Sequence, residues 1–433
     1  MSPRTLFWKI GLLILVASIL LQPDLIGLAA RSGFQSSLDT DPEFGPEFQV
    51  SAQAGQTSIG EEYPAAAFNS REKRYLVVWE NLGASHREIH GQLVSQDGQL
   101  IGNPIVIAAG SSDQIRPCVA YNDIQSEFMV LWMDDASGNG SRYEIRGQRI
   151  TKDGELNGVP FPVEQSSNSL WSPRLAWSGA THLYMVVWSA RKSSSIPFEI
   201  GMKMLYADGS IAALGTLSGD NVRPIQPDIT YNPVDHRFLV VWSQTNNDNS
   251  SSLMGDLREA NGNRVKADAF QIYYQFQRKL LNPRTAFVKN PIGLFFAVVF
   301  ELEITSADHD VYLSLIDRAA YYSPSTFPIA QDVVDEVSPQ VAADRDRTDF
   351  LILYQRGVSA SQLWLYPYPF GSYSEPEYLL CSRDSGSCSQ PAMTWGPSNL
   401  LVIYAGSGPE GPLNIYGRNS GTQSIFLPVI LKD

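Results

Sequence analysis

The sequence is short of basic residues, cysteine and histidine, and each shortage excludes a class of protein. Its 433 residues contain 45 Asp and Glu against 32 Lys and Arg, giving a formal net charge of −13 and a sequence pI near 4.9. A nucleic-acid binder needs a basic face to neutralise phosphates, so we expect no nucleic-acid partner. With three cysteines and five histidines, the chain shows no paired cysteine ligands, nucleophile elbow or phosphate loop. We predict no metal, no cofactor and no catalytic residue.

Long apolar runs and amphipathic helices are also scarce. One apolar run, 10–21, follows a basic N-terminus and precedes small residues ending at Ala29 and Ala30. This order is typical of a secretory signal peptide. Its helix would rise about 18 Å, short of the roughly 30 Å hydrocarbon core, so a membrane-spanning helix is the weaker alternative. We predict a signal peptide over 1–30, a polar linker over 31–46, and a secreted, extracellular or cell-surface protein with no stable membrane span.

Proline and glycine, in contrast, are plentiful, and one proline recurs at a nearly constant interval. There are 33 Gly and 27 Pro, as in a globular chain crowded with turns. Seven prolines that each open a short apolar segment are Pro64, Pro117, Pro173, Pro227, Pro283, Pro339 and Pro391. An aromatic residue closes the next apolar run of each copy; these residues are Trp79, Trp132, Trp188, Trp242, Phe300, Tyr354 and Tyr404. The chain therefore contains seven copies of one structural unit.

Each copy divides into four strands. In the second copy they cover 117–121, 127–132, 144–150 and about 159–163. The last two strands of four copies are joined by a turn dipeptide, namely Asp97-Gly98, Asp153-Gly154, Asp208-Gly209 and Asn261-Gly262. Such dipeptides favour the primed hairpin turns, in which both central residues need positive φ. We predict antiparallel hairpins with primed turns.

The second strand of each copy is a continuous apolar run, which indicates burial on both faces. Four antiparallel strands, a period near fifty residues and two buried faces describe a propeller blade. We predict an all-β fold, a seven-bladed β-propeller forming one domain over 47–420. An open array or a pair of β-sandwiches is the alternative.

The seventh copy lacks a fourth strand of its own. Either Glu47–Ser51, upstream of the first copy, or Ser424–Pro428, downstream, could supply it. We favour the N-terminal strand, because it would remove a sheet edge and tie the two ends of the ring together. The remaining tail, 421–433, is short and apolar; it cannot span a bilayer, and we interpret it as a further edge strand.

The repeat also supports a comparison at the level of a family. The segments Pro227–Asn232, Arg237–Trp242 and Gly255–Gly262 carry the recurring pattern, and it resembles that of secreted bacterial proteins built from β-propeller repeats. The resemblance covers about 47–420 and implies the same fold, but it points to no particular enzyme family. Fold alone does not define function.

The cysteines divide into a pair and a single residue. Cys381 and Cys388 bracket a polar loop between the sixth and seventh copies. Because an exported chain meets oxidising conditions, we predict a disulfide in preference to two free thiols. Cys118 is expected to be a small buried apolar residue. The loop segment Ser382–Gly386 echoes the Asp-box turn of sialidases, but it lacks the final Thr-Trp, and we interpret it as chance.

Two further patterns invite a metal interpretation. His86 and His90 are spaced as zinc ligands on a helix, but they enter a strand, where four residues span about 13 Å, so we expect surface loop histidines. The loops after the second strands carry aspartates that could hold calcium, namely Asp134, Asp135, Asp248, Asp308 and Asp310. No ordered ligand spacing is present, and we expect plain solvated loops.

The residue directly after each recurring proline is the strongest candidate for a functional position. These residues are Ala65, Cys118, Arg174, Asp228, Arg284, Gln340 and Ala392. If the first strands line a central channel, Arg174, Asp228, Arg284 and Gln340 form one arc of it. They could bind a ligand, but we favour an ion-pair ladder between blades, because alternating charges satisfy one another. We also expect the flanking guanidinium groups to favour the ionised form of Asp228.

The resulting functional hypothesis is a non-catalytic, monomeric propeller that binds a glycan, peptide or protein partner through its loop-rich face. The alternative is a carbohydrate-active hydrolase or lyase with its site in the central channel. A hydrolase of this kind needs two carboxyl groups within about 5 to 10 Å, and the sequence places only Asp228 at the inner position.

Overall fold

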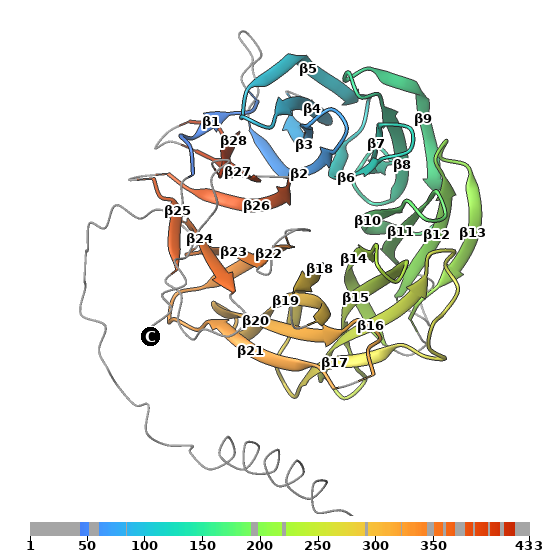
Figure 1. The fold of residues 1–433 in the computed structure, drawn as a ribbon, viewed down its shortest axis with the longest axis vertical. Helices are drawn as coiled ribbons and strands as arrows, with labels where there is room; N and C mark the ends of the chain where they lie inside the picture. The colour runs from blue at the N-terminus through green and yellow to red at the C-terminus, as the bar shows by residue number, and fades with distance from the viewer. Residues whose placement is uncertain are drawn as a thin grey trace, which may run out of the picture. The chain divides into compact units, whose positions relative to one another are not determined.

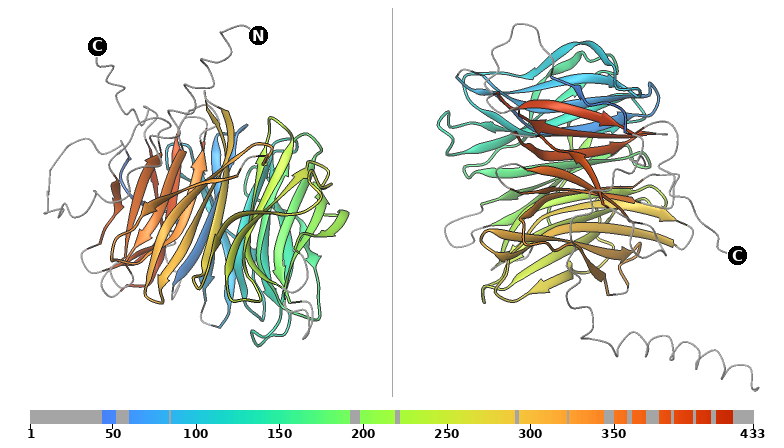
Figure 2. Two further views of the ribbon diagram at one scale, coloured as in Figure 1. Left: turned by 90° about the horizontal axis from the view of Figure 1, so that it is seen from below. Right: turned by 90° about the vertical axis from the view of Figure 1, so that its left-hand side faces the viewer.

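The computed structural model describes residues 44–51, 60–83, 85–191, 198–218, 222–290, 293–321, 323–343, 350–357, 361–368, 377–383, 386–396, 399–407 and 411–420. Over these residues the chain forms seven four-stranded antiparallel sheets arranged in a ring (Figure 1). Figure 2 shows the sheets edge-on, each twisted and packed face to face with its neighbours. The fold is thus an all-β, seven-bladed β-propeller, as the proline spacing predicted. No helix of the described residues is long and apolar enough to cross a membrane.

The strands follow one another outward from the channel in each blade. Blades one to four comprise β2 (Glu61–Asn69), β3 (Arg74–Leu82), β4 (Arg87–Ser95) and β5 (Leu100–Ala108); β6 (Gln114–Asn122), β7 (Glu127–Asp135), β8 (Tyr143–Ile150) and β9 (Leu156–Glu164); β10 (Leu170–Ser178), β11 (Leu183–Ala190), β12 (Glu199–Tyr206) and β13 (Ile211–Thr216); and β14 (Arg223–Asn232), β15 (Arg237–Thr245), β16 (Ser251–Glu259) and β17 (Phe270–Gln275).

Blades five to seven repeat this order. They comprise β18 (Leu280–Asn290), β19 (Gly293–Thr305), β20 (Asp308–Asp317) and β21 (Ser325–Ala330); β22 (Glu336–Ala343), β23 (Phe350–Arg356), β24 (Gln362–Tyr368) and β25 (Tyr378–Cys381); and β26 (Cys388–Trp395), β27 (Leu400–Gly406), β28 (Asn414–Asn419) and β1 (Phe48–Gln49).

The N-terminal strand closes the ring. Phe48 and Gln49 of β1 pair antiparallel with Gly417 and Tyr416 of β28, and blue β1 lies beside red β28 in Figure 1. This pairing confirms the predicted N-terminal closure and covers the edge of β28. The other predicted candidate, 424–428, lies outside the described residues.

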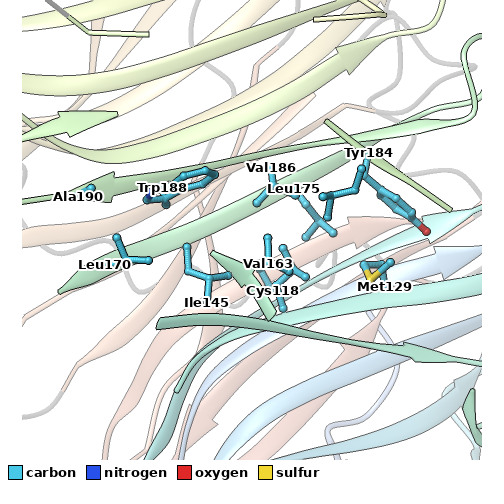
Figure 3. Close-up of a cluster of buried hydrophobic side chains, with 12 residues drawn as sticks. Cys118, Met129, Ile145, Val163, Leu170, Leu175, Tyr184, Val186, Trp188 and Ala190 are labelled. Carbon is cyan, nitrogen blue, oxygen red and sulfur yellow. The ribbon is translucent and has the colours of Figure 1, made fainter. Parts of the chain in front are cut away.

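The core consists of the interfaces between blades. Figure 3 shows the interface of blades two and three, where Met129 and Ile145 of blade two face Leu175 and Trp188 of blade three. All seven predicted aromatic anchors are buried, and the most exposed of them, Trp188, has 4% of its surface accessible. The second strand of each blade is apolar on both sides because a neighbouring blade covers each side.

Two local predictions were wrong in detail. The recurring proline lies inside the innermost strand, three residues after its start in β6 (Gln114–Asn122), instead of opening it. The Asp-Gly and Asn-Gly hairpins exist, but only their glycines have positive φ, from 82° to 90°. The N–H of Gly98 donates to the carbonyl oxygen of Ser95, and the N–H of Ser95 donates to that of Gln99. This is a type I turn followed by a glycine bulge, not a primed turn, and it too matches the strand twist.

Candidate functional site

A β-bulge interrupts the innermost strand of every blade, directly before the proline. The bulge residues all have positive φ, between 47° and 56°; they are Tyr63, Arg116, Ser172, Gln226, Asn282, Ser338 and Gln390. None is glycine, so each backbone is held in a conformation that L residues adopt rarely. Proline suits the next position because it has no N–H to pair in an inner edge strand.

The bulge N–H groups tie each blade to the preceding one. At six of the seven bulges the N–H donates to a side-chain oxygen of the preceding blade; the pairs are Tyr63 with Gln390, Arg116 with Glu80, Gln226 with Ser189, Asn282 with Gln226, Ser338 with Glu301, and Gln390 with Gln355. In four of these pairs the acceptor directly follows the aromatic anchor of its blade. A buried N–H without an acceptor would cost about 1 to 3 kcal/mol, so these contacts stabilise the bulges.

The structure brings three of the four predicted channel residues together. Nε of Arg174 lies 3.5 Å from Oδ1 of Asp228, and Oδ2 of Asp228 accepts the backbone N–H of Thr285 at 2.8 Å. Arg284, on the adjoining strand, lies close enough to act on the charge of Asp228. Asp228 therefore links blades three, four and five. Gln340 is half buried at the equivalent place in β22, and within the described residues no hydrogen bond or ion pair joins it to the other three.

Burial, not the neighbouring charge, controls the ionisation of this arc. Burial raises the pKa of Asp228, while Arg284, Arg174 and the N–H of Thr285 oppose the rise. The guanidinium groups act to lower the pKa of Asp228, as expected, but desolvation penalises the charged form more strongly, so the pKa is raised. Burial and the charge of Arg174 likewise lower the pKa of Arg284, to about 10, so this group stays cationic at neutral pH.

A third arginine extends the arc to blade two. Arg116, an exposed bulge residue of blade two, also acts on Arg284 and stacks on the ring of Tyr63 at 3.5 Å. Arg174 and Arg284 both act on Asp228. Glu301 also acts on Arg284, and Arg116 acts on Glu80. Nη1 of Arg174 donates to the carbonyl of its own Pro173, and Arg284 makes the same contact in its own strand, which leaves further N–H donors of both groups for a ligand.

The opposite end of the channel has a different lining. A cavity of about 720 Å³ opens there, lined by residues two to four positions beyond the recurring prolines and by the turns that follow. The aromatic residues in its wall are Phe68, Tyr121, Trp177, Tyr231 and Trp395. The aromatic cavity, as we call it, was not predicted from the sequence. Its signal was available, because the fourth residue after the proline is aromatic in six of the seven copies.

The histidine prediction needs correction. His90 is not in a surface loop: it is 2% exposed in β4 (Arg87–Ser95), where Nε2 lies 2.9 Å from Oε2 of Glu88. Its imidazole ring lies beside the ring of Trp79 in the core. Among the described residues no group of three or more His, Cys, Asp or Glu side chains is placed to hold a metal ion.

The aspartate prediction also needs correction. Asp135 is buried, and its carboxylate accepts the N–H groups of Ser137, Gly138 and Gly140. Burial acts to raise the pKa of Asp135, but these hydrogen bonds together lower it. Asp310 is buried as well. Asp135 and Asp310 are thus structural groups of strand ends, whereas Asp248 is an exposed turn residue, as expected.

The cysteines lie as predicted. Cys381 ends β25 and forms a disulfide with Cys388, which begins β26, so the bond joins blades six and seven. Cys118 is free and buried.

Comparison with solved structures confirms the architecture. A protein of unknown function from Dyadobacter fermentans aligns with 88% of this chain and 98% of its own, at 10% identity and a TM-score of 0.53. The polysaccharide lyase Uly1 aligns with 89% and 98%, at 10% identity and a TM-score of 0.55. An alpha-L-arabinanase from Penicillium chrysogenum, complexed with arabinobiose, aligns with 88% and 99%, at 10% identity and a TM-score of 0.52. At this identity the similarity shows the fold alone. No protein-family model and no curated protein matches the sequence.

Proposed function

We propose that this protein is a secreted, non-catalytic propeller that binds an anionic glycan at the loop-rich mouth of its channel. The observation that carries the proposal is that Arg174 and Arg284 flank Asp228 at one level of the channel, while Nη1 of each donates to its own proline carbonyl. Planar guanidinium forks pair with carboxylates in a bidentate manner. A uronate carboxylate is the glycan group that would accept the remaining N–H donors of Arg174 and Arg284.

Binding fits this arc better than catalysis does. A glycosidase needs one carboxyl group to transfer a proton and a second one to act on the sugar or on water. Both oxygens of Asp228 already have protein partners, Arg174 and the N–H of Thr285. Glu301, the nearby acid, accepts two bonds from Asn282 and one from Ser338. The polysaccharide-acting neighbours support a glycan as the ligand class, and the disulfide supports an oxidising, extracellular location.

The test compares charged and neutral sugars. Calorimetric titration with a uronate oligosaccharide, and with the neutral oligosaccharide of the same length, should show binding of the uronate alone. Arg174→Gln and Arg284→Gln should each weaken it about tenfold or more, and Arg174→Lys should recover part of the loss because it keeps the charge but not the fork. Arg71→Gln, at an exposed turn residue, is the matched control.

Two results would contradict the proposal. Equal affinity for charged and neutral sugars in the parent protein would show that the arc has only a structural role. Release of reducing ends or unsaturated products from the same oligosaccharide, abolished in Asp228→Asn, would show that the protein is a hydrolase or lyase. Thermal unfolding of every variant separates lost binding from lost folding.

A further inference from the structure

The aromatic cavity is chemically opposite to the arginine arc at the other end of the channel. Of the twenty described residues that line it, one is acidic, Asp123, one is a histidine, His236, and none is lysine or arginine. Asp123 and His236 are exposed turn residues, so the cavity reaches solvent between them. Its volume, about 720 Å³, lies within the range of small-molecule sites.

The cavity wall is held in place by pairs of aromatic rings. Phe68 packs on Tyr75 at 4.8 Å between ring centroids, and Trp177 packs on Tyr184 at 4.6 Å. Tyr121 and Tyr231 are supported in the same way by the second residue of the next strand. The rings are therefore rigid before any ligand arrives, which lowers the entropy cost of binding.

The polar atoms of Trp177, Tyr121 and Tyr231 are already used within the protein. Nε1 of Trp177 donates to Oδ1 of Asp123 at 2.6 Å, the hydroxyl of Tyr121 donates to Oγ of Ser126 at 3.3 Å, and the hydroxyl of Tyr231 lies 3.1 Å from Nδ1 of His236. A sugar would compete for these same atoms, whereas the π-systems remain available. The bond from Trp177 also fixes the carboxylate of Asp123 at the rim.

We infer that the aromatic cavity binds an organic cation, an alkylated or quaternary ammonium group. Aromatic rings attract such a cation through their quadrupole, and the effect grows when the cation is desolvated. The carboxylate of Asp123 supplies the counter-charge, and no lysine or arginine among the described lining residues opposes it. This inference does not depend on the proposed glycan site, which uses residues of opposite charge at the other mouth.

The decisive probe is choline, compared with its uncharged isostere in which a tert-butyl group replaces the trimethylammonium group. Both fill the same volume, so the cavity distinguishes them by charge alone. Calorimetric or NMR titration of the full chain should give choline about tenfold tighter binding than the isostere. Asp123→Asn should weaken choline binding about tenfold and leave the affinity for the isostere unchanged. Asp97→Asn, which removes an exposed carboxylate from a turn at the same end of blade one, should change neither.

Each other outcome overturns the inference. Equal affinity for choline and its isostere would show a purely apolar cavity, and tighter binding of a neutral methyl glycoside would show a sugar site. No titratable binding of any probe would show that the rings serve only to pack the blades. Because Asp123 is exposed, its substitution should leave thermal unfolding unchanged. Arg284→Gln should leave choline binding intact, and this result keeps failure of the two sites distinguishable.

Discussion

The buried carboxyl group of Glu80 should make the stability of the fold depend on pH. Its side chain is 0% exposed, and Oε2 lies 3.7 Å from Nη1 of Arg87, while Oε1 accepts the bulge N–H of Arg116 at 2.6 Å. Burial raises the pKa of Glu80 to about 7, and the Arg116 N–H and the two guanidinium charges offset this only in part. The blade-to-blade bond at this bulge is therefore made by a carboxyl group that is protonated in mild acid.

The sign and size of the effect follow from linkage. Between about pH 4.5 and pH 7 the folded protein keeps a proton on Glu80 that the unfolded chain has released, so the free energy of unfolding falls as pH rises. Each pH unit in this interval lowers the free energy of unfolding by at most about 1.4 kcal/mol. The total loss of stability is therefore at most about 3 kcal/mol and is complete above pH 7. Gln keeps the carbonyl acceptor but does not titrate. We expect Glu80→Gln to match the parent within about 1 kcal/mol near pH 5 and to exceed its stability by about 2 to 3 kcal/mol near pH 8.

Denaturant unfolding at about pH 5, 6.5 and 8, followed by tryptophan fluorescence, measures this difference. Glu61 and Glu336, whose pKa burial also raises to about 7, are present in both proteins and cancel in the comparison. Glu155→Gln, at an exposed hairpin position, is the control and should run parallel to the parent. If Glu80→Gln also runs parallel to the parent, the carboxyl group is ionised in the fold at mild acidity and the reasoning fails.

Three further changes test other contacts. Trp188→Ala should cost about 3 to 5 kcal/mol of unfolding free energy, because it empties a buried site between two blades; a loss below about 1 kcal/mol in denaturant unfolding would refute the anchor role. Replacing Cys381 and Cys388 by Ser should cost roughly 2 to 3 kcal/mol, and a thiol reductant should then lower the melting temperature of the parent but not that of the variant. Asp228→Ala should cost about 3 to 5 kcal/mol, because it removes the carboxylate between the partly buried groups of Arg174 and Arg284; unchanged melting would show that the charges are independently solvated.

The number of blades and their aromatic anchors could be predicted because each buried second strand appears in the sequence as an apolar run, and these runs recur at a regular interval. A strand covered on both faces must be apolar throughout, as in Phe238–Trp242, and such a run repeats wherever a blade repeats. The closing strand β1 was predictable by a different argument, the removal of an exposed edge. Both arguments depend on the exclusion of water from the fold, and its requirements can be recognised from residue types without knowledge of individual contacts.

The bulges were not predicted, because the bulge residues themselves give no signal; the recurring proline after each of them was the available sign. Positive φ is usually adopted by glycine or asparagine, but here residues such as Tyr63, Gln226 and Ser338 adopt it. The strain is offset by contacts from another blade, for example the Glu301 carboxylate that accepts the N–H of Ser338 at 2.6 Å. A long-range contact of this kind has no local sequence pattern. The same reason explains why His90 was misplaced: its burial depends on neighbouring strands.

In the channel, the number of residues between a side chain and the recurring proline of its blade determines how deep that side chain lies. The innermost strands all run from the loop-rich mouth to the mouth with the aromatic cavity, so residues at one offset from the prolines lie at one depth. The first residue after the proline provides the arc of Arg174 and Asp228, and the fourth provides the rings of Trp177 and its equivalents. Three residues of extended strand separate these levels by about 10 Å. The two sets of side chains therefore belong to different levels of the same strands, and we expect a substitution at one level to leave the ligand preference of the other unchanged.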